Sequence, residues 1–173
     1  MWMRVSRILK HRWQRDDAAQ RAIPPALLAK LAALVATSEA SHSGEIRIYV
    51  EAGLPLSYLW RAASMTEIIH ERALAMFGKL RVWDTAHNNG VLIYLLLAEH
   101  RIEIVADRGL NERVAPGIWT HLVEEMRAAF KSGDFEAGLT QAVQEVSALL
   151  QSHFPVVPGQ HNPNELPNLP QLG

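Results

Sequence analysis

Three short polar segments of this 173-residue sequence carry the side chains that could do chemistry. They span residues 42–45, 84–89 and 107–108, and each adjoins an apolar stretch. Polar residues at the ends of apolar elements are where binding sites usually form. The candidate ligand-binding residues are Glu45, Asp84, His87, Asn88, Asn89, Asp107 and Arg108.

These groups allow more than one chemistry. Carboxylate and amide oxygens could hold a divalent cation such as calcium or magnesium, and Glu45 and Asp107 are the candidate metal ligands. An aspartate near a histidine could instead serve acid–base or phosphoryl chemistry, for which Asp107 and His87 are the candidate catalytic residues. Arg108 would suit an anion or a partner's carboxylate. Residues 88–90 also read as a simple turn, since Asn and Gly tolerate left-handed conformations.

The hydrophobic pattern predicts the strands that position these segments. Residues 46–51 alternate apolar and polar side chains, which predicts a half-buried strand. The continuous apolar run 91–98 is typical of a central strand that is covered on both faces. A tight turn at 99–100 leads into 101–107, which we expect to run antiparallel to the preceding strand.

Helical spacing of apolar residues predicts helices before, between and after the strands. The crossover over 57–77 is predicted to be helical, with a break near Ser64 and with Gly78 as its C-cap. Such a crossover makes the first two strands parallel. Gly133 ends a later helix and Asp134 caps the last one. We therefore predict an α/β layered sandwich, with a mixed sheet and helices on both faces.

This topology gathers the three polar segments at one end of the sheet. The first segment precedes a strand, the second precedes its parallel neighbour, and the third follows the antiparallel strand. We therefore expect five side chains to lie within about one ligand's width of each other. They are Glu45, His87, Asn89, Asp107 and Arg108.

The composition excludes several classes of protein. The chain has 17 Lys and Arg against 18 Asp and Glu, so no overall positive field recruits nucleic acid. It has no cysteine, which removes disulfides and thiolate metal sites. No apolar run approaches the roughly 20 residues of a membrane-spanning helix. We expect a cytoplasmic protein that binds an unidentified protein or small anionic ligand.

The two ends of the chain differ from the domain predicted over 23–155. Residues 1–22 are basic and amphipathic, and we expect one helix whose apolar residues pack on the domain. A membrane surface or a partner is the alternative contact. The packing residues would be Ile8, Leu9 and Trp13. Residues 156–173 are rich in proline, which predicts an extended tail without fixed structure.

Several motifs together resemble the TPM domain family. They are 42–47 (HSGEIR), 89–94 (NGVLIY) and 107–110 (DRGL), in this order, together with 73–77 and Thr85. The resemblance covers roughly 23–155 and is nearest to a bacterial branch without a secretion signal or membrane anchor. It implies an α/β sandwich. It also implies the acid phosphatase activity and divalent-cation binding that are attributed to some members.

The sequence departs from the family pattern at two acidic positions. Many members have an acidic residue just before the Asn-Gly pair, where this chain has Asn88. Many have another aspartate further on, where Pro116 stands here. We therefore favour a binding or accessory module that uses the polar end of the sheet. A divalent-cation-dependent phosphatase is the first alternative, and a peripheral membrane protein that uses its basic N-terminal helix is the second.

Overall fold

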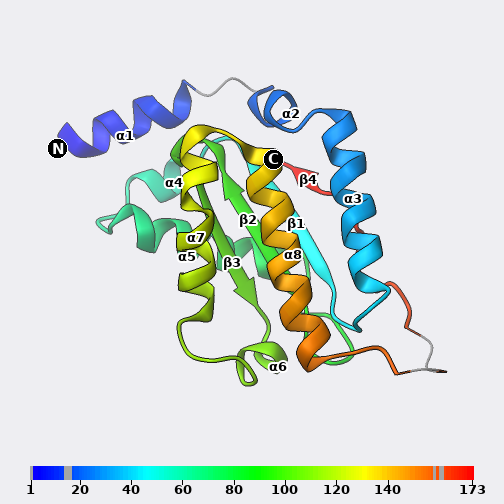
Figure 1. Ribbon diagram of the computed structural model, residues 1–173. Helices are drawn as coiled ribbons and strands as arrows, with labels where there is room; N and C mark the ends of the chain where they lie inside the picture. Colours follow the sequence, from blue (N-terminus) through cyan, green and yellow to red (C-terminus); the bar gives the residue numbers. More distant parts are fainter. Residues whose placement is uncertain (1, 14–16, 158, 160–161) are drawn as a thin grey trace.

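A four-stranded mixed sheet forms the centre of the computed structural model (Figure 1), which describes residues 2–13, 17–157, 159 and 162–173, with side chains from residue 7 onward. β1 runs parallel to both β2 and β4, and β3 runs antiparallel to β2, in the order β3-β2-β1-β4. The strands are β1 (Ile46–Glu51), β2 (Val91–Leu96), β3 (Arg101–Ala106) and β4 (Gln171–Leu172). The predicted α/β sandwich with a mixed sheet is confirmed.

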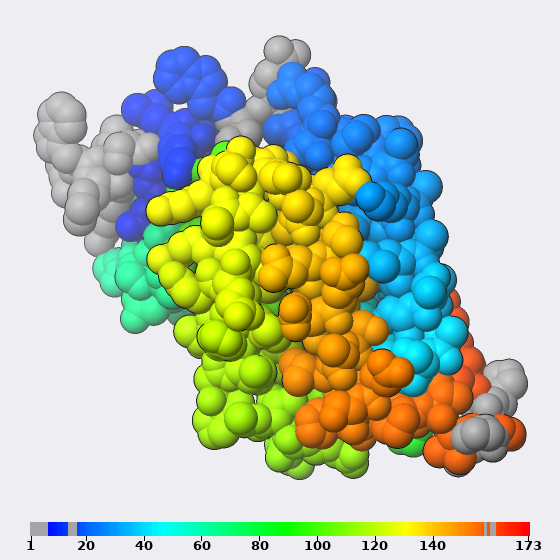
Figure 2. Space-filling view, viewed as in Figure 1, coloured from blue at the N-terminus to red at the C-terminus, as the bar shows by residue number. Residues whose placement is uncertain are grey.

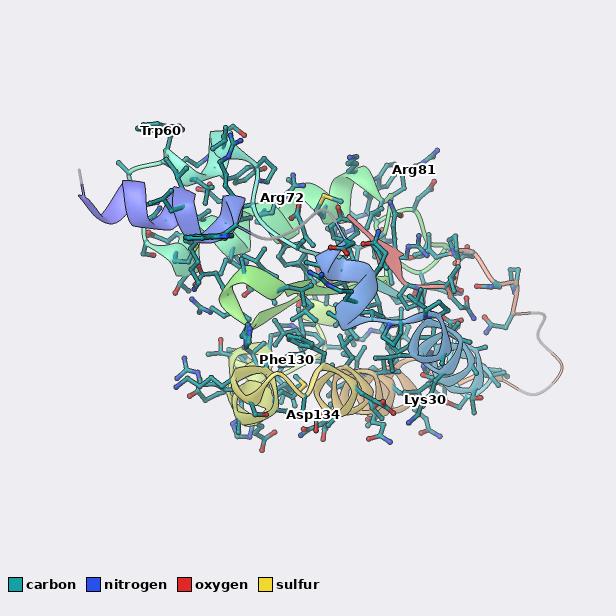
Figure 3. All side chains as sticks on the ribbon, turned by 90° about the horizontal axis from the view of Figure 1, so that it is seen from above. Lys30, Trp60, Arg72, Arg81, Phe130 and Asp134 are labelled. Carbon is teal, nitrogen blue, oxygen red and sulfur yellow. The ribbon has the colours of Figure 1, made fainter. Side chains whose placement is uncertain are left out.

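Three long helices cover one face of the sheet, in front in Figures 1 and 2. They are α3 (Pro25–Glu39), α7 (Ile118–Ser132) and α8 (Phe135–His153). Their apolar sides and the facing residues of β1, β2 and β3 form one buried cluster. Removal of this apolar surface from water is the main force that holds the layers together. Figure 3 shows Phe130 and Asp134 in this helical layer.

The end of α7 and the start of α8 confirm two predicted boundaries. Gly133 adopts φ 79° directly after α7, a left-handed conformation that glycine enters without steric cost. Asp134 caps α8, because its side chain accepts a hydrogen bond of 3.0 Å from the Ala137 backbone N–H.

The second face of the sheet is covered by α5 (Met65–Lys79), with the short helix α4 (Leu56–Leu59) beside it. The predicted break at Ser64 is confirmed, since Ser64 and Glu67 form a capping box that starts α5. The C-cap predicted at Gly78 is wrong. The helix continues through Lys79, because the Leu80 N–H still donates to the Met76 carbonyl at 2.8 Å. 

Two details of the predicted strands are also wrong. All six residues of β1 are buried, including Arg47, rather than only the apolar half. α5 and the C-terminal segment cover the face that was expected to meet water. β2 ends at Leu96 rather than at residue 98, and a 3₁₀ turn at Leu97–Glu99 leads to His100 in a left-handed conformation.

The basic N-terminal segment forms two helices, α1 (Trp2–Arg12) and α2 (Ala18–Ala22), rather than one. Residues 1 and 14–16 of the predicted helix lie outside the described residues. α1 packs on the domain through Ile8 and through buried His11, which accepts the Leu54 N–H at 3.0 Å. The predicted packing is wrong for two side chains, since Leu9 is 56% and Trp13 84% exposed.

The expectation that the proline-rich tail lacks fixed structure is wrong for residues 162–173, which we call the strap. The strap runs back along β1, buries Leu166 and Pro170, and ends in β4. Residues 158 and 160–161 of the predicted tail lie outside the described residues. Proline lacks the N–H that a ladder needs, so β4 forms only after Pro170. The sequence pattern missed the strap because the side chains of Glu45 and Arg47, rather than a strand ladder, bind much of its main chain.

Candidate functional site

The strand register brings the three polar segments to one end of the sheet. Ile46 lies opposite Val91, and Val91 lies opposite Ala106 on the other side. Backbone hydrogen bonds continue this register into the loops, where the Val91 N–H donates to the Glu45 carbonyl at 2.8 Å and the Asp107 N–H donates to Gly90 at 2.9 Å. The meeting of the three segments that the topology predicted is thus present in the backbone.

Four residues form what we call the sheet-end cluster: Asn88, Asn89, Asp107 and Arg108. Arg108 is exposed and donates from its guanidinium to the Asn88 side-chain oxygen at 3.3 Å. Asp107 accepts the Arg108 N–H at 2.7 Å and thereby caps the short helix α6 (Arg108–Asn111). The Gly109 N–H donates to the Asn88 carbonyl at 2.9 Å, and a Cβ at this position would lie 2.5 Å from that oxygen. Only glycine permits this approach of the two loops.

Two oxygens of the sheet-end cluster are buried and accept no hydrogen bond from the described residues. Asn89 is fully buried and donates to the Ser43 hydroxyl at 3.3 Å, but its Oδ1 atom has no partner. The Oδ2 atom of Asp107 is likewise buried without a hydrogen-bond partner among the described residues. A buried acceptor without a partner costs about 1–3 kcal/mol. This end of the sheet therefore has two hydrogen-bond acceptors that the fold itself leaves unpaired.

Glu45 faces the strap instead of the sheet-end cluster. Its carboxylate is 1% exposed and accepts the backbone N–H groups of Glu165 at 3.2 Å and Leu166 at 3.0 Å. Burial raises the pKa of Glu45, although these two hydrogen bonds oppose the rise. No hydrogen bond within the described part of the chain joins Glu45 to Asp107, the other candidate metal ligand.

Asp84 and His87 lie on the outer side of the polar loop. Asp84 is exposed and pairs with Arg81 at 2.6 Å, and Figure 3 shows Arg81 pointing away from the sheet. His87 is exposed and makes no hydrogen bond to Asp107 among the described residues. The two candidate catalytic residues therefore do not form an acid–base pair in this structure.

His87 lines a pocket of about 180 Å³ between the polar loop and the C-terminal segment. The loop approaches this segment through the Ala86 N–H, which donates to the Glu165 carboxylate at 3.1 Å. Sequence reasoning missed the contribution of Glu165, because it placed residues 156–173 outside the domain. The full lining is Ser43, Ala86, His87, Pro155, Val156, Val157, Asn162, Pro163 and Glu165.

His42, the second imidazole of the polar segments, has a structural role. It is completely buried, with Nε2 2.7 Å from the Ser38 hydroxyl and Nδ1 3.0 Å from the Gly44 carbonyl. Burial lowers the pKa of His42, so the neutral ring is favoured. Both ring nitrogens are used, and His42 joins the end of α3 to the start of β1.

The residues at the sheet end do not fit a dedicated calcium or magnesium site. Asp107 is the single carboxylate of the sheet-end cluster, and Arg108 places a positive charge beside it. The Asn88 oxygen is taken by Arg108 and the Glu45 oxygens by the strap. Calcium usually takes 6–8 oxygen ligands. Within the described ranges no group of three or more His, Cys, Asp or Glu side chains could hold a metal ion.

Comparison with known proteins agrees with this fold. The TPM domain matches residues 17–149, which is most of the sequence. The chain therefore belongs to the TPM domain family. It is also similar to the NMR structure of the BA42 protein from the psychrophilic bacterium Bizionia argentinensis, with 26% identity and a TM-score of 0.69. That similarity covers 84% of this chain and 91% of BA42.

No curated protein matches the sequence. Among the residues that the structure describes, no helix is both long and apolar enough to cross a membrane. The family match ends before the strap and begins after α1.

Proposed function

We propose that this protein is a binding module without catalysis, and that its sheet-end cluster receives an anionic group such as a partner's carboxylate or a small anion. The observation that supports this is the state of Arg108, whose guanidinium is exposed and bonded to a neutral amide. Arg47, Arg101 and Arg113 also donate to uncharged oxygens. The arginines that pair with carboxylates are Arg21, Arg61, Arg72, Arg81 and Arg127.

The chemistry of the cluster favours an anion over a cation. A guanidinium offers several N–H donors in a planar fork that matches the geometry of carboxylate and phosphate groups. Asn88 stands where many family members have an acid, so the cluster holds one negative and one positive side chain. The side chain of Asn88 also holds the guanidinium in place, which lowers the entropy lost on binding.

The phosphatase alternative has weaker support. Phosphoryl transfer through a metal requires a set of oxygen ligands that converge on one point, and Asp107 is the one carboxylate of the sheet-end cluster. His87 is separate from it. We therefore derive no hydrolytic step for this site.

The membrane alternative is supported by one feature of α1. Leu9 on α1 and Trp13 directly after it are exposed, α1 contains no acidic residue, and such side chains favour a lipid interface. Binding of the full chain to anionic vesicles at physiological salt would support it. Loss of that binding in a Leu9→Ser, Trp13→Ser double variant would assign the contact to α1.

The proposed function is tested with inorganic phosphate and with acetate as probes. Each is titrated into the full chain, and the thermal midpoint is recorded. A ligand at ten times its dissociation constant stabilises the folded state by about 1.4 kcal/mol. We expect Arg108→Gln to remove this stabilisation. Arg127→Gln, an exposed arginine on α7, is the matched control and should retain it. Equal stabilisation of the two variants would contradict the proposal.

A further inference from the structure

Two charged side chains at the start of β1, Glu45 and Arg47, hold the strap through its main chain. Arg47 donates to the carbonyl oxygens of Pro167 and, at 2.9 Å, of Leu169. It also donates to the Gln171 side chain at 3.1 Å. Glu45, which directly precedes β1, accepts two consecutive backbone N–H groups of the strap. The Arg47 guanidinium thus binds carbonyl oxygens of the strap, and the Glu45 carboxylate binds its N–H groups. The two side chains recognise the backbone of an extended chain.

Both charges are buried by the strap. Glu45 is 1% and Arg47 8% exposed. Burial of a charge is costly unless partners replace its hydration. The partners here are peptide groups that any extended segment possesses. Withdrawal of the strap would return both charges to water, so the undocked state recovers their hydration and is not prohibitively unfavourable.

The other contacts of the strap are spread along its length. Asn162 donates to the Glu39 and His42 carbonyls at 3.2 Å. Glu165 accepts the Ala86 N–H at 3.1 Å. The pairing of the strap with β1 is limited to Tyr49 with Gln171 and Val50 with Leu172. Leu166 is buried in one core cluster and Leu172 packs against the other. Leu169 is 58% exposed.

The strap also lies outside the family domain. The TPM match ends at residue 149, whereas β1 lies inside it. The edge of β1 therefore belongs to the shared domain, and the segment that covers this edge does not.

We propose that the edge of β1 is a binding site for an extended, proline-containing segment of another protein, and that the strap is its displaceable resident occupant. The incoming segment would add a parallel strand to the sheet, a common mode of peptide recognition. Prolines suit this site because Glu45 and Arg47 bind the main chain there. The segment therefore does not need the N–H groups of a full strand ladder. This inference is independent of the sheet-end cluster.

The last position of the groove adds a specificity element. The Gly173 N–H donates to the Val50 carbonyl at 2.9 Å, and the Ala52 N–H donates to the Gly173 carbonyl at 3.3 Å. A Cβ at residue 173 would lie 1.9 Å from the hydroxyl oxygen of Tyr49. A larger residue at this position would therefore have to displace the Tyr49 side chain, which disfavours it.

The test uses a fluorescein-labelled peptide with the sequence of residues 162–173 and the full chain. A tethered strap competes at an effective concentration in the millimolar range, so wild-type protein should bind the peptide weakly. Leu166→Asp places a charge at the buried anchor of the strap and should raise the peptide affinity about tenfold or more. Leu169→Asp alters an exposed leucine of the same strap and is the matched control, with affinity unchanged.

Arg47→Met added to Leu166→Asp should abolish the gain, because it removes the groove's donors. The proposal is overturned if folded Leu166→Asp protein binds the peptide no more tightly than the Leu169→Asp control. A wild-type dimer formed by exchange of straps would assign the groove to a second copy and overturn the assignment to another protein.

Amide hydrogen exchange of the wild-type chain gives a second test that needs no variant. If the strap is displaceable, the N–H groups of Leu166 and Gly173 exchange through a local opening. They should then exchange at least about tenfold faster than the core amide of Val91, which requires a larger opening. Equal rates for the three amides would show that the strap leaves only when the whole domain unfolds, and would overturn the proposal.

Discussion

Buried polar groups are hydrogen-bonded at the edge of β1, whereas two buried oxygens of the sheet-end cluster are unpaired. At the edge, Glu45 and Arg47 are almost fully buried, and their hydrogen bonds go to the main chain of the strap. At the sheet end, the Oδ1 atom of Asn89 and the Oδ2 atom of Asp107 are buried without a partner among the described residues. Arg108 beside them remains exposed.

The difference separates two uses of polar residues. A polar group that is fully satisfied within the chain contributes to one defined arrangement, and its removal leaves partners unpaired. A group that the fold leaves unsatisfied costs stability, and folding alone does not explain its presence. Substitutions at the β1 edge should therefore affect stability, whereas those at the sheet end should affect binding.

A substitution in the apolar core should cause the largest loss of folding stability, and effects in the other two regions can be compared with it. Leu95 is fully buried in β2, between Val50 of β1 and Ile102 of β3. Leu95→Asp should abolish cooperative folding, because an unpaired buried charge costs several kcal/mol against a total of about 5–15 kcal/mol. Circular dichroism during heating measures this. A cooperative transition near the wild-type temperature would contradict the assignment of β2 as the central strand.

Arg47→Met tests the satisfied region. The change keeps much of the apolar stem but leaves the carbonyls of Pro167 and Leu169 without their donor. We expect the free energy of unfolding in urea to fall by about 2–4 kcal/mol. Arg108→Met is the matched control and should change it by no more than about 0.5 kcal/mol. Similar losses for the two variants would remove the distinction between the regions.

The raised pKa of Glu39 predicts how the free energy of unfolding depends on pH. Its carboxylate accepts the Ile46 N–H at 3.0 Å, and burial raises its pKa from 4.5 to about 7. The folded state therefore favours the protonated form, and wild-type stability should rise as pH falls from 8 to 5. At about 1.4 kcal/mol per pH unit the full effect is at most about 3 kcal/mol.

Glu39→Gln isolates this effect. The variant keeps the acceptor for Ile46 without the charge, so it should be more stable than wild type at pH 8. Its advantage should shrink at pH 5. His42 acts in the opposite direction below its ordinary pKa, but it is present in both proteins and its contribution cancels in the difference. A difference in urea stability that does not vary with pH would place the pKa of Glu39 near its usual value.

Asp107→Asn should have a small effect on stability. The side-chain oxygen that caps α6 remains, and the Oδ2 position has no hydrogen-bond donor to lose. We expect the free energy of unfolding to change by no more than about 1 kcal/mol. A loss of several kcal/mol in urea unfolding would mean that Asp107 is part of a structural network instead of a binding site.

The sequence predicted the elements whose signals are local. The alternation at Ile46, Ile48 and Val50 and the apolar run of β2 located the central strands. The order of strands and crossover then placed the polar segments at one end. These inferences succeeded because periodicity and topology depend on few long-range details.

The strap and the role of Glu45 depend on contacts between distant residues. The prolines of the strap argue against a strand, and they do prevent a ladder before Gln171. The hydrogen bonds come instead from Glu45 and Arg47, more than 115 residues earlier. Neither side chain shows in the sequence that its partner is a distant backbone. The unsatisfied oxygens of Asn89 and Asp107 likewise become visible only when the packing around them is known.

The central claim, that the sheet-end cluster is the binding site, is tested most directly by amide chemical-shift mapping. Inorganic phosphate and acetate are titrated into the ¹⁵N-labelled full chain at constant ionic strength, and Arg108→Gln is examined in parallel. We predict saturable shifts centred on Asn88, Arg108 and Gly109 in wild type, and their loss in the variant. Shifts that are absent from these residues, or that persist unchanged in Arg108→Gln, would contradict the account.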